Sequence, residues 1–110
     1  MNKFSLPDLK NRTAVVCSYI LNKKSYKFKF QWCADFCTVD IYLINNGTNI
    51  YILKGFPIVP NSNLLARIKT SELISGYLSI KNKYDKDTDI TRELFSKDFE
   101  LVYDNIGIEN

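Results

Sequence analysis

The chain has 110 residues, with 45% hydrophobic and 14% aromatic content, which indicates one folded domain and excludes a disordered chain. A domain of this length buries a core without disulfides or metals. The net charge of +3 is too small for a dedicated binder of duplex DNA.

Residues 1–11 show no clear hydrophobic period and predict an N-terminal arm. A single β-rich domain is expected over residues 12–104, followed by a C-terminal tail over 105–110. The stretch from Thr13 to Leu21 is apolar and rich in β-branched residues, and residues 22–24 read as a turn. The first element of the domain is therefore expected to be a strand.

The next predicted strand, SYKFKFQW over residues 25–32, alternates without exception. One of its faces is aromatic and carries Tyr26, Phe28, Phe30 and Trp32. The opposite face carries Lys27 and Lys29. We expect the aromatic face to lie in the core and the lysines to point outward, because this alternation is typical of a half-buried strand. A surface that stacks single-stranded bases would instead place aromatics and lysines on the same exposed face.

Residues 36–44 predict a third strand, whose apolar core face carries Cys37, Val39, Ile41 and Leu43. Asp40 lies on the opposite face. Asn46 and Gly47 tolerate the positive φ that both central positions of a type I′ turn require, so the chain is expected to return as the fourth strand of a hairpin. Gly55, Pro57 and Pro60 then interrupt the pattern, and residues 56–59 form a short edge piece.

The second half of the chain has weaker signals. Residues 61–76 have a helix-like composition, with Ser71 and Glu72 in a single turn, and residues 76–83 predict a further strand. Residues 89–99 predict a short helix with Asp89 or Thr91 as N-cap and residues 92–94 in its first turn, before a closing strand over 99–105. Six to seven short strands with one or two helical turns predict a mainly β fold, a small single-domain barrel or sandwich.

The side chains on which most active sites depend are absent or isolated. The chain has no histidine, which removes the commonest general base and the usual zinc ligand. Cys17, Cys33 and Cys37 could supply at most three thiolates. The acids of DKDTD, residues 85–89, lack the following glycine and glutamate of an EF-hand loop, and the four glycines form no phosphate-binding loop. We therefore expect no enzyme, no cofactor and no metal, but a protein that acts by binding.

The start of the sequence lacks the apolar segment of a signal peptide, and no apolar run is long enough to span a bilayer. We therefore expect synthesis in a cytoplasm, reduced thiols and no membrane contact.

The order of these features resembles the plug proteins in the baseplates of contractile-tailed phages such as cyanophages. The matching pieces are YKFKFQW, FCTVDIYLINNGTNIYILKG, FPIVPNSNLLARI and DITRELFSKDFELVY, which fall within residues 25–103. The chain departs from the family at Cys33, where members usually have asparagine, and at PNSN before the leucine pair, where they often have glycine.

This resemblance implies a structural part of the virion that plugs or lines the hub and tube axis of the tail baseplate, made in the cytoplasm of a bacterial host. It implies hub, tail-tube or other baseplate proteins as partners, self-association with a trimer favoured over a hexamer, and no catalytic residues. The candidate interface residues are Lys27, Lys29, Asp40 and Phe56. The residues expected to shape turns and core are Trp32, Asn46, Gly47, Gly55, Leu64, Leu65 and Tyr103.

Two other functions stay open at this point. A single-strand nucleic-acid-binding β-barrel would show an affinity that falls steeply with salt, although the separation of lysines from aromatics makes nucleic acid the less expected partner. A small phage protein that binds one host partner would be a stable monomer with an exposed apolar patch.

Overall fold

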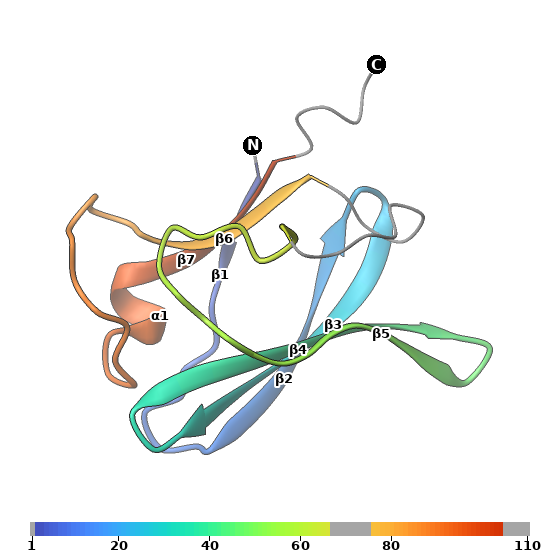
Figure 1. The fold of residues 1–110 in the computed structure, drawn as a ribbon, viewed down its shortest axis with the longest axis horizontal. Coiled ribbons are helices and arrows are strands. Elements are labelled where there is room, and N and C mark those ends of the chain that lie inside the picture. The colour runs from blue at the N-terminus through green and yellow to red at the C-terminus, as the bar shows by residue number, and fades with distance from the viewer. Residues whose placement is uncertain (1, 67–75, 105–110) are drawn as a thin grey trace.

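The structure, a computed structural model, describes residues 2–66 and 76–104. Two antiparallel sheets pack face to face as a sandwich (Figure 1). The larger sheet has the order β2 (Ala14–Leu21), β3 (Lys24–Cys33), β4 (Phe36–Asn45) and β5 (Thr48–Pro57). The smaller sheet has the order β1 (Asn2–Ser5), β7 (Phe99–Asp104) and β6 (Tyr77–Asn82), and the one-turn helix α1 (Phe95–Asp98) leads into β7. The mainly β expectation is confirmed as a sandwich, because the two sheets stay separate and do not close into a barrel.

The larger sheet is a meander of hairpins between neighbouring strands. Asn22 and Lys23 join β2 to β3 with φ of 51° and 69°. Asn46 and Gly47 join β4 to β5 with φ of 53° and 78°. Positive φ at both central positions is the condition for a type I′ turn, so the predicted turn at Asn46-Gly47 is confirmed.

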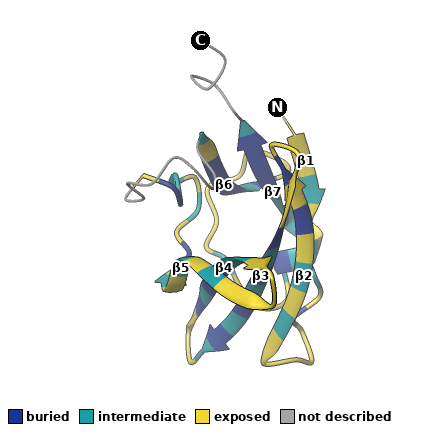
Figure 2. Cartoon of the chain, turned by 90° about the vertical axis from the view of Figure 1, so that its right-hand side faces the viewer, coloured by how far each residue is buried: buried dark blue, intermediate teal, exposed yellow. Residues whose placement is uncertain are grey.

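The core lies between the sheets and is mainly aromatic on the side of β3. Tyr26, Phe28 and Phe30 are fully buried, and Trp32 is 7% exposed. The ring of Phe30 lies 5.2 Å from that of Phe95, which connects the larger sheet to α1. In Figure 2 the colours for buried, intermediate and exposed residues follow one another along the strands of the larger sheet. The predicted aromatic core face of β3 is confirmed.

The N-terminal segment differs from the expected arm over residues 1–11. Residues 2–5 form β1, which pairs with β7, and Leu6 and Leu9 are buried. The hydroxyl of Tyr19 in β2 donates a hydrogen bond of 2.8 Å to the carbonyl of Ser5. This segment is therefore part of the sandwich, held by contacts with residues distant in the chain.

Strand β5 differs from the expected strand end at Gly55. Its register with β4 shifts twice, between Val39 and Ile41 and between Ile41 and Tyr42. Gly55 has a φ of 62° and lies in a bulge, so β5 continues to Pro57. The expected short edge piece over residues 56–59 is thus the end of β5 and the two residues after it.

The second half follows the prediction more loosely. The short helix forms but begins at Phe95, three residues later than expected. The amide of Leu94 donates to the hydroxyl of Thr91 at 3.2 Å, so Thr91 stabilises the turn before the helix. Most of the helix-like stretch, with Ser71 and Glu72, lies outside the described residues.

Candidate interaction surfaces

The outer face of the larger sheet, which points away from the sandwich, carries both lysines predicted to point outward. Lys27 and Lys29 are half-buried there, opposite Tyr42 and Asp40 of β4. Within residues 2–66 and 76–104 an ion pair joins Lys3 to Glu100 at 3.7 Å, and neither Lys27 nor Lys29 forms one. A charge without a partner on a formed strand is available to a neighbouring protein.

The same outer face also holds two tyrosines. The rings of Tyr42 and Tyr51 lie 5.1 Å apart, and the ammonium group of Lys54 lies 5.1 Å from the Tyr51 ring. Sequence reasoning separated lysines from aromatics along β3 alone and missed this group. Counting outward from the Asn46-Gly47 turn would have found it, because the hairpin register places Tyr51 opposite Tyr42.

Asp40 has a structural role within this face. The bulge of β5 leaves the amide of Gly55 without a ladder partner, and this amide donates a 2.6 Å hydrogen bond to Oδ1 of Asp40. A carboxylate is a strong acceptor for such a group. Asp40, predicted as an interface residue, and Gly55, predicted as a structural one, are thus brought together by one bond.

The other predicted residues lie in or next to the core. Phe56 is half-buried against it, opposite Val39. Leu64 and Leu65 are buried, and the amide of Leu64 donates to the carbonyl of Leu78 at 2.7 Å. Tyr103 in β7 is 2% exposed. These positions hold the sandwich together, whereas Lys27, Lys29 and Asp40 lie on the outer face of the larger sheet.

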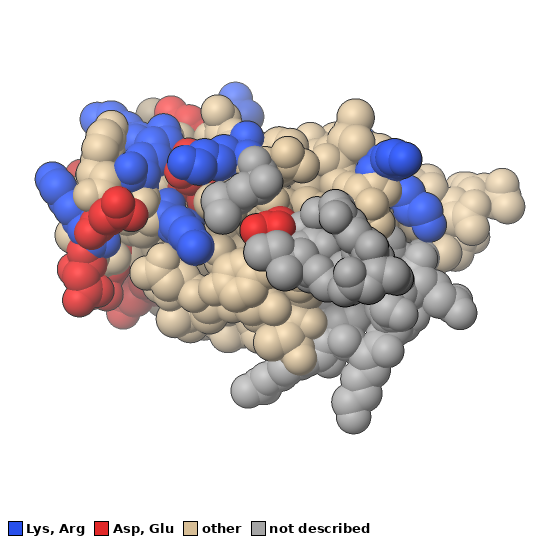
Figure 3. Space-filling view, turned by 90° about the horizontal axis from the view of Figure 1, so that it is seen from above, with Lys and Arg blue, Asp and Glu red and all other residues tan. Residues whose placement is uncertain are grey.

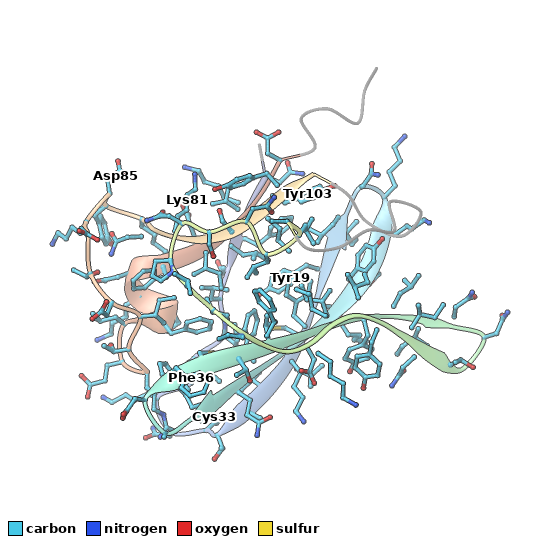
Figure 4. The ribbon with its side chains drawn as sticks, in the orientation of Figure 1. Tyr19, Cys33, Phe36, Lys81, Asp85 and Tyr103 are labelled. Atoms are coloured by element: carbon cyan, nitrogen blue, oxygen red, sulfur yellow. The ribbon has the colours of Figure 1, made fainter. Side chains whose placement is uncertain are left out.

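Burial weakens the acidity of two of the three thiols. Cys17, Cys33 and Cys37 are free, and burial raises the pKa of Cys17, and that of Cys37 to about 12. The Cys17 thiol donates to the hydroxyl of Tyr19 at 3.5 Å (Tyr19 lies between the sheets in Figure 4). Within the described residues no group of three or more His, Cys, Asp or Glu side chains could hold a metal ion. Cys17 and Cys37 therefore stay protonated at neutral pH.

The acidic loop after β6 is organised by the buried Asn82. Its Oδ1 accepts from the amides of Tyr84 at 2.8 Å and Lys86 at 3.4 Å, and its Nδ2 donates to Thr88 at 3.2 Å. A hollow of about 220 Å³ lies beside it, lined by Asn61, Asn82, Asp85, Lys86 and Asp87. The Asn82 amide is used to hold the loop, and the charged side chains that line this hollow, Asp85, Lys86 and Asp87, are exposed.

The charges are distributed unequally over the molecule. In Figure 3, cationic and acidic side chains intermix at the end that holds α1. The end that holds the β4–β5 hairpin shows cationic and uncharged side chains in that view. No helix in the described part of the chain is long and apolar enough to cross a membrane.

Comparison with known proteins identifies a family. The family model described as "Cyanophage baseplate Pam3 plug gp18" matches residues 1–106 of the chain. No curated protein matches the chain.

Proposed function

Since the chain belongs to the cyanophage baseplate plug family, we propose that it plugs or lines the central hub of a contractile tail by binding neighbouring baseplate proteins. The observation that carries this proposal is the family match, which extends over residues 1–106 of 110. The formed outer surfaces of the two sheets support a structural role.

The outer face of the larger sheet is the proposed contact with an acidic neighbour. Lys27 and Lys29 lie two residues apart there on β3, and Asp40 already accepts a bond from Gly55. Cations held in fixed positions select an acidic partner and set its orientation. Tyr42 and Tyr51 add the aromatic contact area that is enriched at protein interfaces.

The proposed place of the protein is the tail baseplate of the virion, after synthesis in the host cytoplasm. Copies arranged around a tail axis share its rotational symmetry. A plug on that axis is therefore expected to form a ring, with three copies favoured and six as the alternative.

One observation favours a second function, binding of single-stranded nucleic acid. Lys27 lies opposite Tyr42, and the Tyr42 and Tyr51 rings pack together on the lysine-bearing face. This places cations and aromatics together, as base-stacking surfaces require. An oligonucleotide titration tests it: the second function expects affinity that falls steeply with salt and is lost in Tyr51→Ala.

Mass spectrometry of purified phage particles tests the proposed function. The proposal expects the chain in the particles at a fixed small-integer copy number relative to the hub protein. A chain that is expressed during infection yet missing from intact particles would overturn it. Salt-sensitive oligonucleotide binding by such a missing chain would favour the second function.

A further inference from the structure

In the described part of the chain the sandwich has four edge strands: β2 and β5 in the larger sheet, and β1 and β6 in the smaller one. An edge strand presents backbone N–H and C=O groups that another strand can pair with, so proteins usually block such edges. Bulges, charges, proline, shortness and covering loops are the usual means. The four edges of this chain differ in whether any of these means is present.

Strand β5 is blocked along its length. Two register shifts interrupt its ladder, and it contains Lys54, Gly55 with positive φ, and Pro57. A twisted, bulged edge with a charge and a proline is a poor template for a further strand.

The edges of the smaller sheet are blocked in other ways. A loop covers β6, because the amides of Asn61 and Leu64 donate to its carbonyls at 2.9 Å and 2.7 Å. Strand β1 has four residues, includes Lys3, and its Ser5 carbonyl accepts the Tyr19 hydroxyl. Neither edge offers a long free ladder.

Strand β2 has none of these features. Its eight residues, AVVCSYIL, contain no charge, glycine or proline, and its register with β3 is regular from Ala14 to Leu21. Its outward side chains include two of the exposed large hydrophobic residues, Val16 at 49% and Ile20 at 66%. An uncharged, regular and apolar edge of this length is the kind that pairs with another strand.

The hydrogen-bond ladder between β2 and β3 identifies which backbone groups of β2 point away from β3. The amide of Trp32 donates to the carbonyl of Thr13 at 2.9 Å, which makes Thr13 and Trp32 a hydrogen-bonded pair. Such pairs alternate along an antiparallel ladder, so the backbone groups of Val16, Ser18 and Ile20 point away from β3. Within residues 2–66 and 76–104 no hydrogen bond from a loop or turn reaches these groups.

We propose that the outer edge of β2 receives an extended strand from a different baseplate protein, an inference that rests on the function proposed above. A second copy paired through β2 would need a twofold axis that reverses one copy, whereas copies in a ring about a tail axis all point the same way. The other three edges of the described chain are blocked, so they are poor donors of the strand. Because β2 is uncharged, the added strand is uncharged too, with apolar side chains beside Val16 and Ile20.

The test removes one outward donor without changing a side chain that the core uses. Ser18→Pro deletes the Ser18 N–H, which points away from β3, so the β2–β3 ladder is preserved. Ser18→Ala is the matched control, because it loses the hydroxyl and keeps the N–H. The double variant Val16→Lys/Ile20→Lys blocks the same edge by charge and replaces the proline variant if that one fails to fold.

Two measurements decide the inference. In the isolated full chain, the amides of Val16, Ser18 and Ile20 exchange with solvent fast, while those of Cys17 and Tyr19 exchange slowly. In particles from infections in which the variant replaces the parent chain, Ser18→Pro lowers the copy number at least about tenfold, as loss of one buried hydrogen bond predicts, and Ser18→Ala does not.

Normal incorporation of a folded Ser18→Pro chain would overturn the inference. Slow exchange at Ser18 in the isolated monomer would also overturn it, since the edge would already be covered by the chain itself. A dimer of the isolated chain that Ser18→Pro dissociates would assign the edge to a second copy instead. Absence of the parent chain from particles would overturn the proposed function, and the exchange data would still report whether the edge is open.

Discussion

The two faces of the larger sheet are built from the same strands and differ in what they contribute. The inner face carries fully buried rings such as Tyr26, Phe28 and Phe30. The outer face carries Lys27 and Lys29, which alternate with these aromatic residues in the sequence. Side chains of a strand alternate between the two faces of a sheet. Along β3, each residue that packs in the core is therefore followed by one that is available to a partner. Mutations one residue apart should therefore have opposite consequences.

The largest expected effect is on the inner face. Phe28 is fully buried, with its ring 5.0 Å from that of Tyr19 and 5.9 Å from that of Phe30. Phe28→Ala should lower the free energy of unfolding by about 3–5 kcal/mol, measured by denaturant titration. Lys27→Ala, one residue away, is the control and should stay within about 0.5 kcal/mol of the parent. Equal unfolding midpoints for Phe28→Ala and the parent would mean that the inner face does not hold the fold.

The next largest loss of stability is expected at the Asn46-Gly47 turn, which sets the register of β4 and β5 and so determines which of their side chains face the core. A slip of one residue in the β4–β5 register would turn every side chain to the opposite face. Gly47 has a φ of 78°, and a Cβ there meets no atom within 4 Å, so the cost of Gly47→Val is backbone strain alone. We expect about 1–3 kcal/mol of destabilisation.

Gly47→Asn is the control for that turn, because asparagine adopts positive φ more readily. Its thermal midpoint should lie between those of the parent and Gly47→Val. A midpoint for Gly47→Val equal to that of the parent would contradict the type I′ assignment.

A smaller loss of stability is expected at Asp40, which lies on the outer face but holds the bulge of β5. Asp40→Ala removes the acceptor of the Gly55 amide and should cost about 1 kcal/mol. Asp40→Asn keeps an oxygen at the same place and should lose less. If urea titration gives the same unfolding free energy for Asp40→Ala as for the parent, the bulge does not depend on this bond.

The smallest effect on stability belongs to the outer lysines. Lys27→Glu/Lys29→Glu should change the free energy of unfolding by no more than about 0.5 kcal/mol, because neither side chain forms an ion pair within the described residues. A loss of several kcal/mol in the same denaturant titration would show that the outer face also supports folding.

Local patterns made part of this fold predictable. The alternation of residues 25–32 and the Asn46-Gly47 pair determine face and turn from neighbours in the sequence, and both predictions are confirmed. The mainly β class, as a barrel or a sandwich, and the resemblance to baseplate plug proteins could also be inferred from the order of such elements.

Contacts between distant residues were not predictable. Strand β1 has four residues, too few for a period, and its partner β7 lies at the other end of the chain. The bond from Gly55 to Asp40 depends on a bulge that no local pattern signals. The unblocked edge of β2 could be recognised only after the sheet order was known.

The most direct test of the account is the copy number of Lys27→Glu/Lys29→Glu in purified phage particles. The control, Lys10→Glu/Lys86→Glu, places the same change of charge on exposed loop positions outside the strands. The account predicts that both variants fold like the parent, that the control is incorporated normally, and that the outer-face pair is depleted from particles. Equal incorporation of the two folded variants would contradict the claim that the outer face binds a neighbour in the baseplate.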